Sequence, residues 1–159
     1  MTASATVPSP IGPLTVEAHA GRITAVRFDD GDGRGTARAD ADELAAAATQ
    51  LEEYFAGRRR IFELPLELRA GRFDRAVLEA VADVPYGERI SYGELAARFG
   101  LTGEDVRKVG GAVGRNPLPI LIPCHRVVGA DGGLVGYGGG LARKAHLLAL
   151  EADQLQLAV

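Results

Sequence analysis

The chain of 159 residues contains a single cysteine, Cys124, which lies between Pro123 and His125. A thiolate is a strong nucleophile, and nearby cationic or basic side chains favour it over the thiol. His125 and Arg126 follow the cysteine directly, so the sequence places such groups beside the sulfur. A cysteine–histidine pair is compatible with acyl transfer, redox chemistry or alkyl transfer, and spacing alone does not choose among them. A small buried hydrophobic residue is the alternative interpretation of Cys124.

The composition excludes several other kinds of site and location. One cysteine cannot form an internal disulfide, and one cysteine with three scattered histidines fits no usual zinc spacing, so we expect no bound metal. The N-terminus lacks a secretory signal pattern, and no apolar run approaches the length of a membrane helix. The sequence therefore predicts a cytoplasmic protein without membrane contact that is stabilised by packing.

The charge distribution leaves room for a nucleic-acid partner. The net charge of −3 argues against a polyanion, because affinity for nucleic acids rests mainly on neutralising phosphates. Acidic residues, however, are concentrated between positions 29 and 53. The second half carries many basic residues: Arg98, Arg107, Lys108, Arg115, Arg126, Arg143 and Lys144.

The first half of the chain predicts a small α/β lobe that ends near residue 70. Residues 11–28 contain two alternating segments separated by Gly21, which predicts a β-hairpin. Residues 29–40 are rich in Gly and Asp and predict a loop, and residues 41–56 have helical periodicity. Residues 61–68 look extended, and their proline favours a sheet edge.

The second half predicts mainly helices. An apolar face that begins at Phe73 runs to a turn at residues 85–87. Residues 90–117 then read as two helices joined by a short turn, with Ser91 and Glu94 forming a capping box and Thr102 repeating that pattern with Asp105. This pattern predicts a helix-turn-helix, with a plain helical hairpin as the alternative.

The segment around Cys124 has two further features. The apolar residues 120–122 look like a buried strand that leads into the cysteine. A glycine-dense loop follows at residues 129–140, and it could form the wall of a pocket for a planar ligand. A C-terminal helix comes next, with four residues expected to face inward: Leu141, Ala145, Leu148 and Ala149.

These motifs resemble one known family. Residues 116–129 (NPLPILIPCHRVVG), 136–141 (GYGGGL) and 147–151 (LLALE) closely resemble the O6-alkylguanine-DNA alkyltransferases, also called methylated-DNA–protein-cysteine methyltransferases. The resemblance extends upstream and covers residues 73–151. It implies an α+β fold with a small, ribonuclease H-like α/β lobe at residues 1–70. The implied C-terminal domain, residues 71–159, is mostly helical and winged helix-turn-helix-like.

The resemblance implies direct reversal of DNA damage, in which an alkyl group moves from guanine O6 to Cys124 without a cofactor and the protein is consumed. By the same resemblance, His125 activates the thiol through a water and Glu151 orients His125. Tyr92 donates a proton toward guanine N3, and Asn116 fixes the turn before the cysteine segment.

Further residues are implied for the pocket and for DNA contact. Pro119 and Tyr137 would sandwich the guanine, and the Gly138 N–H would face O6. Arg107 would enter the base stack in place of the flipped guanine. The remaining implied residues comprise Val127, Gly139 and Lys144 in the pocket, and Gly110, Gly111, Ala112 and Arg115 on the DNA-binding helix.

The sequence departs from the family pattern at three places. The turn at residues 100–105 is one residue longer than the common form and brings Glu104 and Asp105 close to the DNA-binding helix. Gly138 stands where serine is usual, which removes a hydroxyl donor to O6. Leu78 stands where tryptophan is typical.

Two other functions remain open at this point. A cysteine hydrolase or thiol redox protein could use Cys124 and His125. A non-catalytic binder could recognise alkylated guanine and signal to other repair proteins. For the alkyltransferase, the expected partner is double-stranded DNA that contains O6-alkylguanine. The protein would act as a monomer, and cooperative binding along DNA stays an open question.

Overall fold

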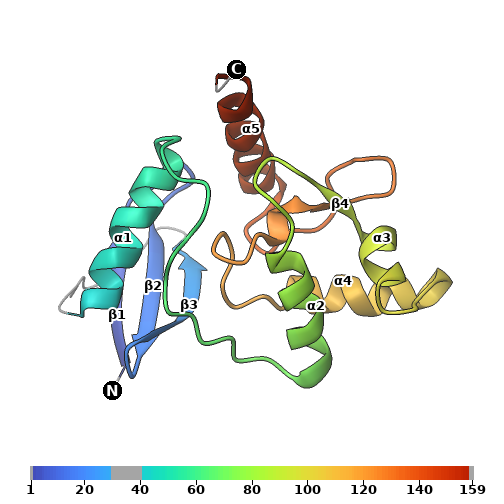
Figure 1. Ribbon diagram of the computed structural model, residues 1–159, viewed down its shortest axis with the longest axis horizontal. Helices are drawn as coiled ribbons and strands as arrows, with labels where there is room; N and C mark the ends of the chain where they lie inside the picture. Colours follow the sequence, from blue (N-terminus) through green and yellow to red (C-terminus); the bar gives the residue numbers. More distant parts are fainter. Residues whose placement is uncertain (1, 30–40, 158–159) are drawn as a thin grey trace. The chain divides into compact units, whose positions relative to one another are not determined.

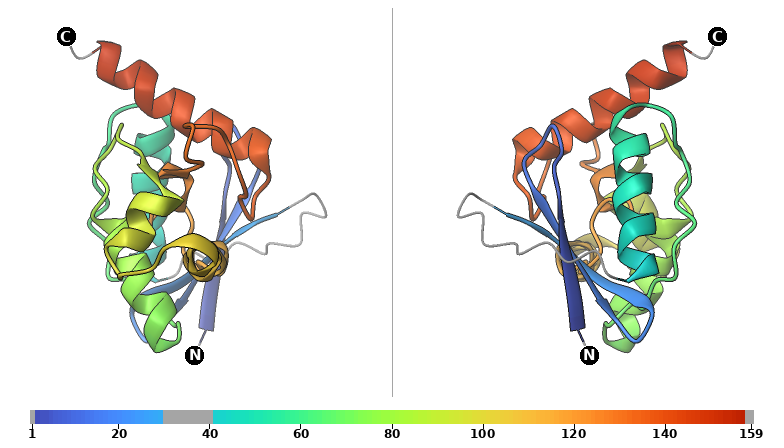
Figure 2. Two further views of the ribbon diagram at one scale, coloured as in Figure 1. Left: turned by 90° about the vertical axis from the view of Figure 1, so that its right-hand side faces the viewer. Right: turned by 90° about the vertical axis from the view of Figure 1, so that its left-hand side faces the viewer.

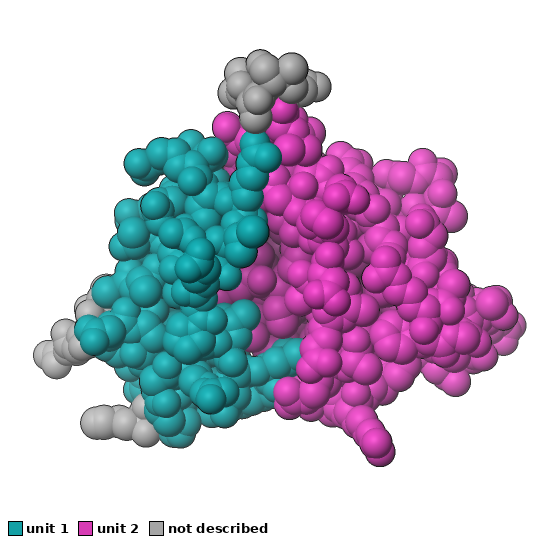
Figure 3. Space-filling model, in the orientation of Figure 1, with its two compact units in different colours: residues 1–69 teal, residues 70–159 magenta. Residues whose placement is uncertain are grey.

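The computed structural model describes residues 2–29 and 41–157, with side chains described as far as residue 155. By their internal contacts, the described residues divide into two compact units, residues 1–69 and residues 70–159 (Figure 3). Most of the loop predicted at residues 29–40 lies outside the described residues.

The first unit contains a three-stranded antiparallel sheet in the order β1-β2-β3 (Figure 1). The strands are β1 (Thr2–Val7), β2 (Leu14–His19) and β3 (Arg22–Phe28). The predicted hairpin is confirmed as β2 and β3, and its two-residue turn places Ala20 and Gly21 at φ values of 51° and 82°, as the right-handed twist of a hairpin favours. Strand β1 was not predicted.

One helix and one extended segment complete this unit. Helix α1 (Asp42–Phe55) lies across one face of the sheet (Figures 1 and 2) and buries Leu44, Ala47, Leu51 and Tyr54. The chain leaves the helix through Gly57, whose φ of 76° suits glycine. Ile23 donates its N–H to the Pro65 carbonyl at 2.7 Å, which confirms the prediction that residues 61–68 run along a sheet edge.

The second unit is mainly helical. It contains α2 (Arg72–Ala82), α3 (Tyr92–Ala97), α4 (Val106–Gly114) and α5 (Leu141–Leu157). It also contains the 3-10 turns η1 (Gly103–Asp105) and η2 (Cys124–Arg126) and a two-stranded parallel sheet of β4 (Ile90–Ser91) and β5 (Val127–Val128). The predicted α+β fold class is therefore confirmed. Within the described ranges, no helix is both long and apolar enough to cross a membrane.

The helix-turn-helix is formed by α3, the turn η1 and α4 (Figure 1). The capping box at Ser91 is confirmed, because the Ser91 hydroxyl accepts the Glu94 N–H at 3.0 Å and the Glu94 carboxylate accepts the Ser91 N–H at 3.4 Å. The matching cap at Thr102 is wrong. Thr102 precedes the turn η1 without a side-chain hydrogen bond, because a 3-10 turn begins there instead of an α-helix.

The segment that leads to the cysteine is not the predicted strand. Residues 118–122 form a tight, buried turn in which Ile122 donates its N–H to the Leu118 carbonyl at 2.8 Å. Ile120 has a φ of 73°, a conformation that is unusual for a β-branched residue. The residues of this turn are apolar because the turn is buried, and this composition also suggests a strand. Cys124 then begins the turn η2.

The inward face of α5 also differs from the prediction. Leu148 is buried as expected, but Leu141, Ala145 and Ala149 are exposed. The buried positions are instead Lys144, Leu147, Leu148 and Glu151. The periodicity of apolar residues predicts the wrong face because two of the four buried residues, Lys144 and Glu151, are charged. A charged side chain is buried only where specific partners bind it.

Candidate active site

Cys124 is almost completely buried at the start of η2, with 6% of its surface exposed. Its N–H donates to the Ile122 carbonyl at 2.7 Å, which fixes the backbone at the thiol. Burial raises the pKa of the thiol, while the Asn116 amide and the positive charge of Lys144 oppose that rise. The thiol therefore depends on these two neighbours and on a base to become a nucleophile.

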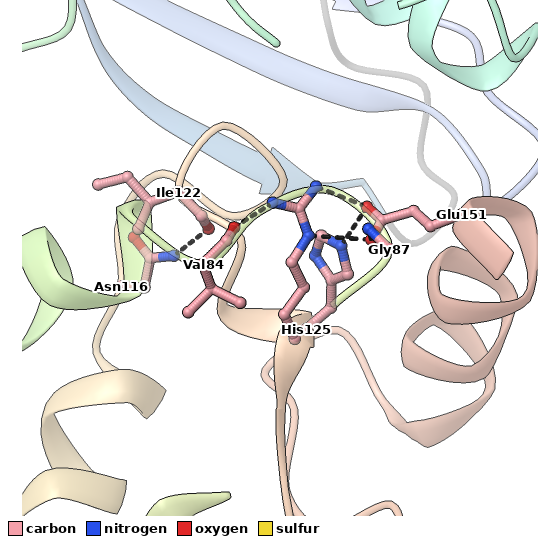
Figure 4. Close-up of polar contacts among 7 residues, drawn as sticks. Val84, Gly87, Asn116, Ile122, His125 and Glu151 are labelled. Carbon is pink, nitrogen blue, oxygen red and sulfur yellow. Dashed lines mark hydrogen bonds and ion pairs between the residues drawn. The ribbon is translucent and has the colours of Figure 1, made fainter. Parts of the chain in front are cut away.

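Asn116 holds the turn that precedes the cysteine. Its side-chain N–H donates to the Ile122 carbonyl at 3.0 Å (Figure 4). Its side-chain oxygen accepts the Leu118 N–H at 2.9 Å. The Asn116 side chain thereby links the first and the last residue of the turn at residues 118–122.

His125 and Arg126 both bind the carboxylate of Glu151, which α5 supplies (Figure 4). The His125 Nε2 lies 2.7 Å from Glu151 Oε2. Arg126 donates from Nε to Oε1 and from Nη2 to Oε2, both at 2.9 Å, and from Nη1 to the Val84 carbonyl at 2.7 Å. All three residues are buried, and together they form a hydrogen-bonded ionic cluster.

The cluster determines the protonation of His125. Burial alone would raise the pKa of Glu151, but the hydrogen bonds from His125 and Arg126 outweigh it and lower that pKa to about 2. Burial lowers the pKa of His125, although Glu151 opposes this effect. A neutral imidazole beside an ionised carboxylate carries its proton on Nε2, so the lone pair lies on Nδ1. In the described part of the chain, the buried Nδ1 has no hydrogen-bond partner and is available as a base.

Lys144 ties the glycine-rich loop to the segment that carries the cysteine. Its buried Nζ donates to the carbonyls of Val127, Val135 and Gly136 at 2.6, 2.9 and 3.1 Å. Burial lowers the pKa of Lys144, although the nearby Cys124 opposes this effect. The ammonium thus replaces its water shell with three carbonyl groups and keeps a positive charge near the sulfur.

Tyr92, the first residue of α3, faces the same loop. Its hydroxyl donates to the Val135 carbonyl at 3.3 Å, a long and therefore weak hydrogen bond. Burial raises the pKa of Tyr92, and the negative charge of an ionised Cys124 raises it further. The phenol is therefore protonated at neutral pH and can donate a proton.

A hollow of about 360 Å³ opens beside Tyr92. It is lined by Tyr92, Val106, Arg107, Gly110, Val135 and Gly136. A Cβ at Gly110 would lie 3.8 Å from the Tyr92 ring, so glycine leaves this wall open. The hollow brings together three residues singled out from the sequence, namely Tyr92, Arg107 and Gly110.

The other predicted pocket residues do not line this hollow. Pro119 and Val127 are buried beside the cysteine segment. Tyr137, Gly138 and Gly139 lie further along the glycine-rich loop, and a Cβ at Gly138 would meet no atom within 4 Å.

Helix α4 exposes only part of the predicted DNA-binding set. Arg107 is exposed, and Gly110 and Gly111 are half-buried. The prediction for Ala112 needs correction, because Ala112 has 0% of its surface exposed and belongs to the core. Arg115, just after the helix, forms an ion pair with Asp74 of α2.

Sequence reasoning missed the role of Arg126 in the buried cluster. The sequence indicates Arg126 only as a cation near the thiol, whereas its guanidinium binds Glu151 and the Val84 carbonyl. The resemblance predicts that Glu151 pairs with His125, and a carboxylate that is buried requires more than one donor. That requirement could have directed attention to Arg126.

Comparisons with known proteins agree with this arrangement along the whole chain. Residues 3–68 match the family described as 6-O-methylguanine DNA methyltransferase, ribonuclease-like domain, and residues 72–153 match its DNA binding domain. The methylated-DNA–protein-cysteine methyltransferase of Mycobacterium bovis is 44% identical over 152 residues, which cover 94% of this chain and 92% of the relative. The constitutive enzyme of that name from Bacillus subtilis is 40% identical and covers 92% and 93%.

Solved structures give the same result. The crystal structure of Mycobacterium tuberculosis O6-methylguanine methyltransferase superposes with a TM-score of 0.84 at 41% identity, over 100% of both chains. A crystal structure of Mycobacterium tuberculosis OGT in complex with DNA also has a TM-score of 0.84, at 43% identity over 95% of this chain and 93% of that one.

Proposed function

Because the chain belongs to the 6-O-methylguanine DNA methyltransferase family, we propose that Cys124 is the residue that accepts the alkyl group. The chain is a methylated-DNA–protein-cysteine methyltransferase that repairs DNA by direct alkyl transfer. In our proposal each molecule acts once, because the alkyl group stays on the cysteine. A protein-cysteine acceptor must be Cys124, since the sequence contains no other cysteine. The hydrolase, redox and non-catalytic binder hypotheses have no support among these relatives.

The observation that carries the mechanism is the 2.7 Å contact between His125 Nε2 and the Glu151 carboxylate, which favours the tautomer with its proton on Nε2. Glu151 holds the Nε2 proton, so Nδ1 can accept the thiol proton, with a water relaying it as the resemblance implies. The thiolate then attacks the alkyl carbon. A sulfur–carbon bond forms, the carbon–O6 bond breaks, and its electron pair remains on the guanine.

Tyr92 neutralises the departing guanine in this proposal. Its O–H leaves the weak bond to the Val135 carbonyl and donates toward guanine N3. The Val127 carbonyl accepts Lys144 at 2.6 Å but retains a second lone pair, which can accept from the exocyclic amine of guanine. The resemblance supports the remaining pocket roles of Pro119, Tyr137, Gly138 and Gly139.

DNA is the partner of the chain, and its binding domain corresponds to residues 72–153. We further propose that the substrate is duplex DNA containing O6-alkylguanine, bound by a cytoplasmic monomer through residues 71–159. A guanine inside a duplex must leave the stack to reach a buried thiol, and Arg107, exposed beside the hollow at Tyr92, would fill the space that it leaves.

The decisive experiment is the intact mass of the protein after incubation with excess duplex carrying O6-methylguanine. We expect one added methylene mass per chain, mapped to Cys124 and absent in Cys124→Ser. A methyl group on any other residue, or continued turnover, would contradict the proposal. Arg107→Ala should slow transfer from duplex DNA far more than reaction with free O6-benzylguanine, since only the duplex requires extrusion of the base.

A further inference from the structure

A second hollow shares Arg107 with the first and takes no part in the chemistry described above. Its volume is about 350 Å³, and Phe73, Arg107, Lys108, Gly111 and Arg115 line it. Three of these five residues are cationic, and Phe73 contributes an aromatic ring, with 39% of its surface exposed. Such a lining suits a ligand that carries negative charge beside an apolar group.

Arg115 shows how an anion binds at this hollow. Its guanidinium forms two parallel hydrogen bonds to Asp74, from Nε to Oδ2 at 2.6 Å and from Nη2 to Oδ1 at 2.9 Å. Arginine uses the same two-bonded geometry for carboxylates and for phosphates. The arginine side chain is 61% exposed and its partner 19%, so water and ligands can reach the pair.

Gly111 allows the guanidinium to take this position. A Cβ on Gly111 would lie 3.1 Å from Nη1 and 3.4 Å from Nη2 of Arg115, closer than most real Cβ contacts. The bare helix surface at Gly111 therefore lets Arg115 fold back over α4 toward α2. This gives one of the α4 glycines a role within the protein itself.

We propose that this second hollow binds a phosphodiester of the DNA backbone and that Asp74 occupies Arg115 in the DNA-free protein. On DNA binding, the guanidinium exchanges the carboxylate for a phosphate oxygen pair. Phe73 faces the adjoining deoxyribose, and Arg107 and Lys108 add positive charge. The inference rests on the proposed function, because it names a contact within the same DNA interface.

A second ion pair next to the hollow points the same way. Lys108 lies 3.2 Å from Asp105, an acid of the lengthened turn, and both side chains are exposed. Two of the three cations at the hollow are thus held by carboxylates of the chain, whereas Arg107 makes no ion pair with any described residue. These acids compete with DNA and weaken its non-specific binding.

The test measures binding of an unmodified duplex over a range of salt concentrations. Asp74→Asn should bind about two- to fivefold more tightly, because Arg115 no longer has to leave an exposed ion pair. Arg115→Ala should bind more weakly, and its slope of log affinity against log salt should be less steep by about 0.9, the value for one lost phosphate contact. Glu79→Gln, which makes the same charge change on an exposed residue of α2, is the matched control.

The double variant separates this proposal from a general charge effect. In the Arg115→Ala background, Asp74→Asn should gain no more affinity than Glu79→Gln does. A full gain in that background, or an unchanged salt slope in Arg115→Ala, would overturn the phosphate site. If Arg115→Ala does not fold, Arg115→Lys serves instead, and it should keep the slope but lose affinity with the two-bonded geometry.

The methyl-transfer assay keeps the two proposals apart. Wild-type protein and Glu79→Gln should each take up one methyl group from the damaged duplex. Absence of transfer in both would count against the proposed function, whereas normal transfer with identical DNA affinities in all variants would count only against the phosphate site.

Discussion

The second unit contains two arginine–carboxylate pairs with nearly the same local geometry in opposite surroundings. Arg126 binds Glu151 through two nitrogens, with side-chain exposures of 7% and 1%. Arg115 binds Asp74 in the same way, with exposures of 61% and 19%. The geometry is therefore not what distinguishes them; burial and the number of additional partners are.

The difference lies in what each pair can do. The buried pair receives one further bond from His125 and offers one to the Val84 carbonyl, so both charged groups are held by additional partners. Breaking it leaves an uncompensated charge inside the protein. The exposed pair can dissociate into water at little cost, which suits a contact that must change when DNA binds. The buried pair holds His125, the proposed base, in one position, whereas the exposed pair leaves Arg115 able to exchange its partner.

The largest expected effect is on the buried pair. Arg126→Met should lower the free energy of unfolding by about 3–5 kcal/mol, because Glu151 stays buried without its main partner. Chemical denaturation of wild type and variant measures the change. The double variant Arg126→Met with Glu151→Gln removes the buried charge as well and should recover part of the loss. If Arg126→Met alone were as stable as wild type, leaving the buried Glu151 carboxylate without Arg126 would cost no free energy, and the prediction would be wrong.

The stability of the protein should fall in acid because Glu151 takes up a proton. The pKa of Glu151 is about 2 in the folded protein, against an ordinary value of 4.5. The unfolded chain therefore binds the proton more readily, so the contribution of Glu151 to stability is complete above 4.5 and is lost as the pH falls from 4.5 toward 2. The difference in unfolding free energy between wild type and Glu151→Gln should shrink over this range. A difference that is constant with pH would contradict the assignment.

A smaller effect is expected at Lys144, a buried cation that binds neutral carbonyl groups. Lys144→Met keeps much of the apolar stem but removes the donor to the Val127, Val135 and Gly136 carbonyls. The free energy of unfolding should fall by about 1–3 kcal/mol, since the Val127 carbonyl, which accepts the buried one of the three bonds, is left without a donor. Hydrogen exchange should show faster opening of the glycine-rich loop while α1 is unchanged, and equal acceleration in both places would indicate global destabilisation instead.

The smallest effect on stability is expected at the exposed pair. Asp74→Asn should change the free energy of unfolding by less than about 1 kcal/mol. Thermal unfolding at low and high salt measures it, and the small difference from wild type should vanish as salt rises. A loss comparable with that of Arg126→Met would show that exposure does not separate the two pairs.

Prediction from sequence succeeded where a short local signal determines the structure. The Ser91–Glu94 spacing gave the start of α3, and Gly21 between two alternating segments gave the β2–β3 hairpin. It failed where partners distant in sequence decide the outcome. Lys144 and Glu151 face inward on α5 only because carbonyls, His125 and Arg126 receive them, and no periodicity of apolar residues contains that information.

The candidate site followed the same rule. The residue types of Cys124, His125 and Tyr92 could be recognised from local motifs, but the partner of Arg115 could not. Asp74 lies 41 positions earlier in the chain and belongs to an unremarkable helix start. The apolar residues before Cys124 suggest a strand because a buried turn and a buried strand are both rich in apolar residues. Only the backbone conformation of Ile120 shows that this segment is a turn.

The left-handed conformation of Ile120 has a consequence for how this position tolerates replacement. A β-branched residue at a φ of 73° carries backbone strain of about 1–2 kcal/mol, which glycine would relieve. The same side chain is 1% exposed, and deleting a buried isoleucine side chain costs about 2–5 kcal/mol in lost packing. The packing loss exceeds the relief, so glycine is a poor substitute although the backbone favours it. The position therefore selects a residue by its volume and against its conformational preference, so that packing holds the turn before Cys124 in a backbone conformation that isoleucine alone would avoid.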